Sequence, residues 1–508
     1  MILSQIITMK YPRLLRALIE TVVMGAVLCS PVVWAQAPKT ASSAPGSPQN
    51  PGKPLPPLPN GSGGNAPLGP IGSTGQGDAQ SDTSGQVQPD THALAGGQFF
   101  GLGSLRRLRN LFDPAVQVSE SGETGILPGK TLSVSRVGGS LGIEQHQKHS
   151  DLTLTYNGAE SFYQPSYYNG IHTLPYQDAA ISQNFYAGRW ILRLRDDVLY
   201  SWGPGFGSLF AAGPAQAGEN SLLEGIQPSL AAVGTIQTAL ARQLSNTTLG
   251  EIDYAHSRRT TLTLLVSYGI VNFLDPGYIN SQNLVGRVGY NYALSAKNSF
   301  ALSYEHNRII FIGSAGQLQT DLAQMEFGRK VTGRLAFQLA AGPQLIHYYY
   351  FATAKRQQLS WSATGSLTYQ WRRTGYSLSY FRGVTAGSGV LFGSSIQTVT
   401  ATARHDFTKT WSASMHGGYA LNKSLASATL LAYRFDDWFA GANLSRPIGR
   451  QFRLELSYGF QQQTTGNGLC PVLSCGLAHP FSEYGVTLGW HPLSGRSGEP
   501  RGTAAVRP

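Results

Sequence analysis

Apolar and polar residues alternate along most of the chain beyond residue 130. Successive side chains of a β-strand point to opposite faces, so a period of two predicts strands with one apolar and one polar face. In the clearest segment, 452–460, the apolar face carries Phe452, Leu454, Leu456, Tyr458 and Phe460. Similar alternation at 190–198, 260–268, 334–339 and 484–490 predicts an all-β protein.

The length of these runs indicates the kind of sheet. Strands of soluble sheets usually have about 5–6 residues, whereas a tilted strand needs about 9–11 residues to cross the hydrocarbon of a membrane. Runs such as 450–463 match the second case. In lipid, backbone groups must be paired within the protein, which requires a closed barrel. We therefore expect a transmembrane, antiparallel, up-and-down β-barrel over 131–491, with a soluble all-β protein as the alternative.

Counting back from Trp490, the pattern predicts about sixteen strands. They are expected near 150–161, 176–187, 190–201, 246–257, 260–272, 283–293, 297–310, 317–330, 333–347, 358–372, 375–384, 395–407, 410–420, 437–446, 450–463 and 482–491. Short turns such as 187–189 and 447–450 then fall at one end, which in bacterial barrels is the periplasmic end. Two further segments, 131–143 and 426–435, also alternate, so eighteen strands is the alternative.

Aromatic residues begin many runs directly after a short polar turn and recur further along the same face. Tyrosine and tryptophan suit a membrane interface because the ring is apolar while its polar group stays hydrated. We expect two outward rings of lipid-interface aromatics, formed by Trp190, Phe300, Tyr304, Tyr376, Tyr380, Trp411, Tyr419, Phe452, Tyr458 and Trp490.

The N-terminal region has a different composition. Residues 1–35 combine basic residues with an apolar stretch at 22–33 and end at Ala35, which predicts a cleaved signal peptide. A transmembrane anchor is the alternative, but the apolar stretch is short for one. Lipidation of Cys29 is a weaker alternative because Leu28 precedes it where a small residue is needed.

Three further segments flank the predicted barrel. Residues 36–90 are rich in Pro, Gly and Ser and are expected to be a disordered linker. Within 91–130, the stretch 99–112 has Leu105, Leu108 and Phe112 at helical spacing, so it is expected to be a short amphipathic segment that Pro114 ends. A small plug, or a stretch of linker packed on the barrel rim, is the alternative. Residues 492–508 are expected to form a disordered tail.

Charge adds a restriction on partners. Charged residues make up 13% of the chain, against about 25% in a typical soluble domain. The formal net charge is +11, but the basic residues are scattered and no nucleic-acid-binding motif is present. We expect no nucleic-acid partner.

Over 150–491 the pattern resembles that of bacterial outer-membrane β-barrel proteins of porin-like size. The resemblance implies a location in the outer membrane, contact with its lipid, and recognition by the outer-membrane insertion machinery. Such barrels commonly end on an aromatic residue. Here the last predicted strand ends at Trp490, and a polar tail follows it.

Cys470 and Cys475 flank a short stretch in the loop before the last predicted strand. Because an exported protein sits in an oxidising compartment, a local disulfide is expected. Free thiols are the main alternative. A zinc site would need further ligands, and only His479 is near. No catalytic motif or cofactor motif is present, so the expectation is a protein that is not an enzyme and has no cofactor.

The polar face of the strands is expected to line a lumen. The charged candidates for this lining are Arg193, Arg195, Asp197, Arg287, Arg334, Arg453 and Glu455. They could bias permeation weakly toward anions, or pair with one another in an inert interior. The long loop at about 202–245 could narrow the lumen or lie on the surface.

A barrel of about sixteen strands is wide enough for an aqueous channel unless it is plugged. The leading hypothesis is a porin-like passive channel for small polar solutes. The alternative is a plugged structural or surface-interaction barrel, tethered by its N-terminal linker, with a periplasmic or cell-wall partner reached through 36–112. The oligomeric state is left open.

Overall fold

The structure of the chain is a computed structural model. It describes residues 111–125, 131–147, 149–164, 172–202, 242–257, 259–276, 278–295, 297–312, 316–332, 334–350, 354–371, 373–385, 392–408, 410–425, 434–449, 451–465 and 480–490. The predicted signal peptide, linker, disulfide and C-terminal tail lie outside these residues. Among the residues described, no helix is both long enough and apolar enough to cross a bilayer.

Eighteen strands form one sheet. The first nine are β1 (Leu111–Thr124), β2 (Thr131–His146), β3 (Ser150–Gln164), β4 (Thr173–Ala187), β5 (Trp190–Trp202), β6 (Arg242–Ala255), β7 (Thr260–Phe273), β8 (Asn280–Ala293) and β9 (Asn298–Ile312). The other nine are β10 (Gln317–Lys330), β11 (Leu335–Tyr350), β12 (Ala354–Trp371), β13 (Thr374–Thr385), β14 (Ser394–Asp406), β15 (Ser412–Ser424), β16 (Arg434–Ile448), β17 (Phe452–Thr465) and β18 (Phe481–Trp490).

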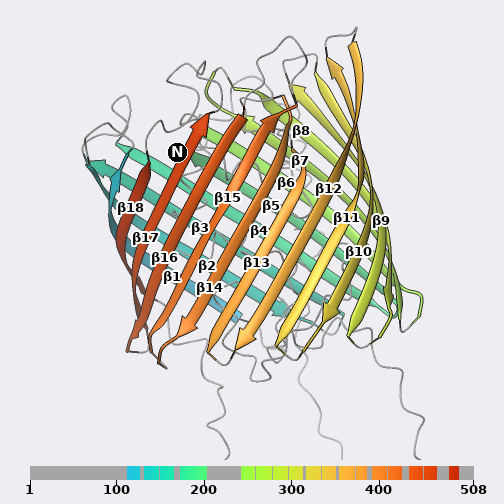
Figure 1. Cartoon of the computed structure of the whole chain (residues 1–508). Coiled ribbons are helices and arrows are strands. Elements are labelled where there is room, and N and C mark those ends of the chain that lie inside the picture. Colours follow the sequence, from blue (N-terminus) through green and yellow to red (C-terminus); the bar gives the residue numbers. More distant parts are fainter. Residues whose placement is uncertain are drawn as a thin grey trace, which may run out of the picture. The chain divides into compact units, whose positions relative to one another are not determined.

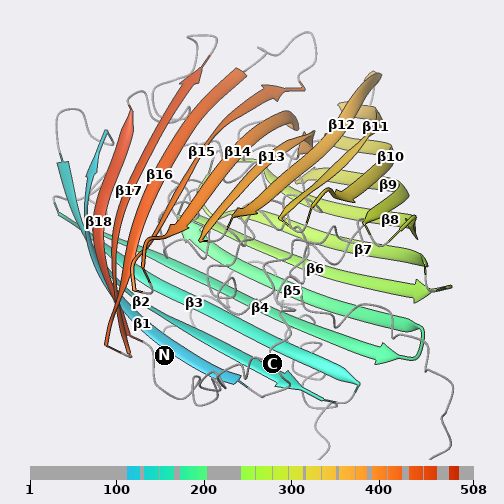
Figure 2. The same cartoon turned by 60° about the horizontal axis from the view of Figure 1, so that its bottom comes forward.

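Each strand pairs antiparallel with its neighbours in sequence, and the last strand pairs with the first. The closing ladder between β1 and β18 runs from Val116 opposite Trp490 to Thr124 opposite Ser482. Figures 1 and 2 show the strands running obliquely around a closed wall, with β1–β9 on one side and β10–β18 on the other. The fold is therefore an all-β, closed, antiparallel, up-and-down barrel, as the alternation predicted.

The strand count of sixteen is wrong, and the alternative of eighteen is confirmed. All sixteen expected strands are present as β3–β18. The two additional strands both lie before them, and β2 corresponds to the candidate at 131–143. The candidate at 426–435 adds no strand, because β15 pairs directly with β16. Because an even number of strands is added before the expected sixteen, the short turns still fall at one end of the barrel and the longer connections at the other.

Strand β1 corrects the expected lead-in at 91–130. Residues 111–124 form a strand, and Pro114 lies inside it. A proline is tolerated near the end of a strand or outside a ladder because it removes only one backbone donor. Pro114 precedes Val116, the first residue of β1 that pairs with β18. Phe112 is an outward strand residue and is exposed, so it is not part of a helix, whereas the predicted amphipathic stretch at 99–110 lies outside the described residues.

Connections define two ends of the barrel. At what we call the short-turn end, β2–β3, β4–β5 and the following even–odd strand pairs are joined by turns of a few residues. Gly188, in the turn between β4 and β5, has a φ of 62°, a conformation that glycine adopts without steric cost. β1 begins and β18 ends at this end, and the long connection 203–241 belongs to the other, the long-loop end.

One ladder is locally irregular. Between β10 and β11, the pairing goes from Leu322 opposite Gln344 to Met325 opposite Ala341 without intervening pairs. Pro343 lies in this interval and has no backbone N–H to donate. At Gly342 an added Cβ would lie 1.7 Å from the carbonyl oxygen of Ala323, so glycine permits this close approach.

The closing seam contains a buried charge cluster. Glu123 of β1 lies directly opposite Glu483 of β18 in the register. Like charges opposite each other in a sheet are destabilising, and both side chains are buried. Arg136 of β2 hydrogen-bonds to both, with Nη2 2.6 Å from Glu123 Oε1 and Nη1 bonded to Glu483. One arginine therefore bridges the two carboxylates that face each other at the seam.

The seam generates the first prediction. The variant Arg136→Met keeps much of the apolar volume but leaves two buried carboxylates facing each other, so the free energy of unfolding should fall by about 3–5 kcal/mol. Denaturant unfolding of the folded barrel in detergent micelles, followed by tryptophan fluorescence, measures this. Arg308→Met is the matched control. Arg308 is an outer-wall arginine that bonds Gln317, and its removal should change stability by about 0.5 kcal/mol or less. Equal unfolding curves for both variants would contradict the assigned role of Arg136.

Candidate channel lumen

The two faces of the barrel wall differ sharply in chemistry. Large apolar side chains such as Leu194, Val266, Leu302 and Leu488 are about half exposed on the outer face. The positions that alternate with them, such as Arg195, Ser267 and Ser303, are polar and point inward. An apolar exterior around a polar interior is the arrangement of a transmembrane β-barrel. The inner face is therefore the candidate functional surface.

The structure places six of the seven predicted lumen-lining residues on the inner face. Arg193, Arg195 and Asp197 alternate on β5 with the exposed residues Leu194 and Val198.

The other three follow the same rule on other strands. Arg287 lies inward on β8, and Arg453 and Glu455 lie inward on β17. Arg334 does not belong to this set, because it is exposed in the turn between β10 and β11. Alternation was extended by one residue beyond the actual strand start at Leu335.

Several inner arginines are paired with carboxylates on the same or the next strand. Arg193 hydrogen-bonds to both Glu251 and Asp253 of β6, and all three side chains are buried. Thr263 of β7 donates to Asp253 at 2.5 Å, which extends the network to a third strand. Arginine suits such sites because its planar fork donates several hydrogen bonds at once. The network ties neighbouring strands together on the lumen side.

Two further pairs have the same form. Arg195 binds Asp197 through two hydrogen bonds of 2.7 Å each. Arg287 on β8 binds Glu305 on β9. Sequence reasoning found the arginines but missed Glu251, Asp253 and Glu305. The signal that could have found them is the alternation itself, because these residues share a face with polar neighbours in strands that were predicted.

Solvent access to the inner face is uneven around the barrel. On β6, β7 and β9, inward side chains such as Thr247, Ser267 and Ser303 are buried from one end of the strand to the other. On β14, β15 and β17, inward residues near the short-turn end are partly or fully accessible, including Arg404, Ser414 and Ser457. Accessible lumen therefore adjoins β14–β17 at the short-turn end.

Buried apolar side chains gather on parts of the inner face toward the long-loop end, beside buried polar ones such as Gln243 and Asn422. There, inward side chains such as Leu132 and Phe481 are fully buried. The largest cluster joins Ile309 and Phe311 of β9, Leu318 of β10, Ile346 of β11 and Val384 of β13. We call these buried apolar residues near the long-loop end the apolar collar.

An ion pair fixes one loop beside this end of the barrel. Arg242, the first residue of β6, donates from Nη2 to Asp275 Oδ1 at 2.7 Å, and its backbone N–H donates to Oδ2 at 2.6 Å. Burial alone would raise the pKa of Asp275, but the hydrogen bonds from Arg242 hold that pKa below its ordinary value. The loop after β7 is therefore held by a charged contact that stays ionised at neutral pH.

The predicted interface aromatics lie on the outer side of the wall. Trp190, Tyr304, Tyr376, Phe452 and Tyr458 are exposed there. The remaining strand positions of the set share the same outward parity, and these are Phe300, Tyr380, Tyr419 and Trp490. Trp411 precedes β15, with the Arg446 guanidinium 5.0 Å from its ring. Their arrangement in two rings at the lipid interfaces stays a prediction.

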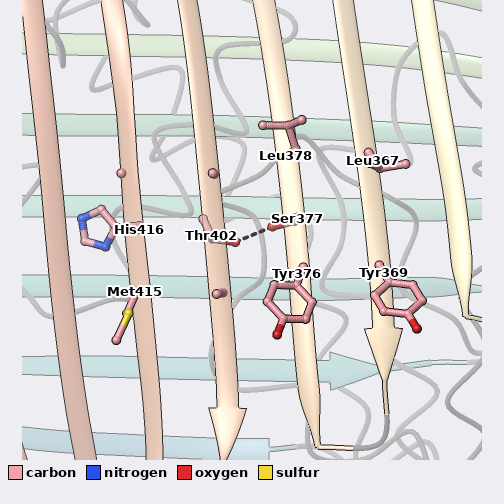
Figure 3. A pocket seen from close by; sticks show the side chains of 11 residues that line it. Leu367, Tyr369, Tyr376, Ser377, Leu378, Thr402, Met415 and His416 are labelled. Carbon is pink, nitrogen blue, oxygen red and sulfur yellow. Dashed lines mark hydrogen bonds between the residues drawn. The ribbon is translucent and has the colours of Figure 1, made fainter.

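A hollow of about 390 Å³ lies on β12–β15 (Figure 3). Its walls include Leu367, Tyr376, Leu378 and Met415, and all four are exposed on the outer face. Figure 3 shows the Ser377–Thr402 hydrogen bond between two of the strands. Because these apolar walls face the same side as the rest of the apolar exterior, the hollow is suited to lipid and is not a polar-solute site. Within the described residues no group of His, Cys, Asp and Glu is placed to hold a metal.

The closed sheet, its apolar exterior and its polar interior define the chain as a transmembrane β-barrel of the outer-membrane class. No protein-family model matches the sequence. No curated protein matches it either.

Solved structures to which the chain is similar include Pseudomonas aeruginosa OpdK with vanillate, at 9% identity and a TM-score of 0.39, covering 75% of this chain and 98% of that one. Another is Pseudomonas aeruginosa OccK2 (OpdF) in complex with glucuronate, at 9% identity and a TM-score of 0.40, covering 75% and 97%. Pseudomonas aeruginosa OpdQ matches at 8% identity and a TM-score of 0.38, covering 75% and 98%.

The uneven access to the inner face predicts uneven thiol labelling. In a background with Cys29, Cys470 and Cys475 replaced by serine, Ser457→Cys should react readily with a charged, membrane-impermeant thiol reagent. Ser267→Cys should react at least about tenfold more slowly than Ser457→Cys, because the rate of labelling follows exposure of the thiol. Mass spectrometry of the folded barrel over time measures both rates. Equal rates would show that the inner face is equally open on both sides.

Proposed function

We propose that the protein is a porin-like passive channel for small polar solutes in the outer membrane. The observation that carries the proposal is the accessible polar inner face beside β14–β17, which includes Arg404, Ser414, Arg453, Glu455 and Ser457. A closed barrel of eighteen strands is large enough to enclose an aqueous lumen in addition to its inward side chains. The polar lining would replace part of the hydration shell of a passing solute.

A second candidate is a plugged structural or surface-interaction barrel, tethered through its N-terminal linker. The burial of the inner face along β6, β7 and β9, and the apolar collar near the long-loop end, favour this candidate. The predicted partner reached through 36–112, recognition by the insertion machinery, and the local disulfide of Cys470 and Cys475 stay predictions under either candidate.

Planar-bilayer recording on the refolded full chain separates the two candidates. A channel should give stepwise currents. In the background without native cysteines, attachment of a bulky thiol reagent to Ser457→Cys should reduce the step, because this side chain points into the accessible part of the lumen. Tyr458→Cys is the matched control, since Tyr458 is its neighbour on the lipid-facing side.

A reagent effect at Tyr458→Cys equal to that at Ser457→Cys would contradict a current through the lumen. A barrel that inserts, shows β-rich circular dichroism and gives no steps would reject the channel and favour the plugged barrel. Resistance of the folded protein to denaturation by unheated detergent serves as the folding check for every variant.

A further inference from the structure

Toward the long-loop end, basic side chains lie on the outer wall of one side of the barrel. Four of them point outward on β9–β16, and we call this set the basic band: Arg308 of β9, Arg382 of β13, Lys423 of β15 and Arg434 of β16. Each shares its face with an exposed outer-wall residue of the same strand, and these are Tyr304, Leu378, Met415 and Trp438. The basic band therefore faces the lipid side of the wall and not the lumen.

Two members of the basic band are held by neutral groups. Arg308 is exposed, and its Nη2 donates to Gln317 Oε1 at 2.8 Å. The guanidinium carbon of Arg382 lies 4.1 Å from the centre of the Trp361 ring. An amide oxygen and an aromatic face both attract a cation without cancelling its charge. These two arginines therefore keep a full positive charge at the outer surface.

The other two members share one carboxylate. Arg434 Nε lies 2.8 Å from Asp436 Oδ2, and its side chain is 52% exposed. Lys423 lies directly opposite Arg434 in the register between β15 and β16 and is exposed. One carboxylate between two cations leaves this part of the basic band positive as well.

A second outward carboxylate, Asp321 of β10, lies among groups of β9 and β11. Tyr304 donates to its Oδ1 at 2.6 Å, and His306 Nδ1 lies 2.8 Å from the same oxygen. His347 Nε2 lies 3.7 Å from its Oδ2. With both histidines neutral, the four basic side chains exceed Asp321 and Asp436 by two charges on the described outer wall of β9–β16 near this end.

The outer wall of β1–β5 has the opposite charge. Glu120 of β1, Glu160 of β3 and Asp196 of β5 point outward. Glu120 accepts a hydrogen bond from Ser133, and Asp196 accepts one from Thr248 at 2.6 Å. Within the described residues of β1–β5, no lysine or arginine points outward. The two sides of the barrel therefore present different charges to the surrounding lipid.

The height of the basic band places it at the level of lipid headgroups. Arg382 lies eight residues from the short-turn end of its strand, and Arg434 lies fourteen residues from that of its own. A strand rise of about 3.3 Å and a tilt of about 40° give about 2.5 Å per residue along the barrel axis, so the basic band lies about 20–35 Å from the short-turn end. The apolar band of such barrels is about 25 Å tall. Trp361 and Tyr304, which contact members of these clusters, are each 47% exposed, as suits the interface.

Basic side chains at this level favour a phosphate-bearing occupant. Arginine and lysine bind phosphate oxygens through charge-assisted hydrogen bonds, and arginine can donate two at once. Clusters of basic residues next to a membrane bind anionic lipid headgroups. A solute in the lumen cannot reach the basic band, because its members lie on the other face of the wall.

We propose that the basic band binds the phosphate groups of lipid headgroups in the leaflet that surrounds the long-loop end. Such lipids are then enriched beside β9–β16 and depleted beside β1–β5. Arg308 and Arg382 are the principal contacts, because their present partners are neutral. The proposal concerns the outer wall, so it applies equally to an open barrel and to a plugged one.

Native mass spectrometry of the full chain, folded in neutral detergent micelles, tests the proposal. The protein is titrated with phosphatidic acid, which carries a phosphate monoester, and with phosphatidylcholine of the same acyl chains. The wild type should bind phosphatidic acid several-fold more tightly. The double variant Arg308→Gln, Arg382→Gln should weaken the binding of phosphatidic acid by about fivefold or more and leave that of phosphatidylcholine unchanged. Resistance to unheated detergent checks that each variant is folded.

The matched control is the double variant Arg259→Gln, Arg334→Gln. It removes the same charge from exposed arginines in short turns at the opposite end of the barrel, so the affinity for phosphatidic acid should stay close to that of the wild type. Equal affinity of the wild type for the two lipids, or an equal loss in the two double variants, would overturn the proposal.

Two further results would assign the basic band to another occupant and so reject lipid. Inorganic phosphate should not displace phosphatidic acid, because the acyl chains add apolar contact with the wall. Displacement that depends on Arg308 and Arg382 would indicate a site for free phosphate. A dimer that forms without added lipid, and is lost in the Arg308→Gln, Arg382→Gln variant, would indicate a second copy of the chain.

Discussion

The closure of the backbone ladder is the constraint on which the rest of this structure depends. In hydrocarbon no water is available to an unpaired N–H or C=O group, and each such group costs several kcal/mol. An open sheet of the same eighteen strands would leave two such edges, and the β1–β18 ladder removes them. Closure brings Glu123 opposite Glu483, and Arg136 is the side chain that makes this register tolerable. Backbone pairing therefore determines where a buried charge cluster has to be placed.

Closure also explains why the inner charges occur in groups. In a closed sheet every inward side chain has neighbours on two adjacent strands, so a charge that points inward is placed beside several candidate partners. Arg193 reaches Glu251 and Asp253 in this way, and Arg287 reaches Glu305. Such pairs hold adjacent strands together on the lumen side. The same side chains therefore serve the stability of the wall and the electrostatics of the lumen.

The sequence was sufficient for the barrel and insufficient for its first strand. Alternation is a local signal, so it located β3–β18 and the inward direction of Arg193, Arg287 and Glu455. At β1 the signal competed with Pro114 and with the helical spacing of Leu108 and Phe112. What settled β1 is its pairing with β18, more than 350 residues away along the chain. The partners of Arg193 were missed for a similar reason, because the 203–241 connection separates β5 from β6 in sequence. The face to which a side chain points can be predicted from the local sequence, whereas the strands that pair with each other cannot.

The distribution of inner side chains along the barrel axis bears on how a solute would travel. Near the short-turn end the wall offers water-accessible polar groups, among them Ser457 and Glu455. Toward the long-loop end Ile309, Phe311 and the other collar residues are buried, together with polar side chains such as Gln243 and Asn422. In the proposed channel, a polar solute would therefore pass from accessible charged groups to a region in which the inward side chains are buried. The accessible end would act on the choice of solute, and the buried end would act on its rate of passage.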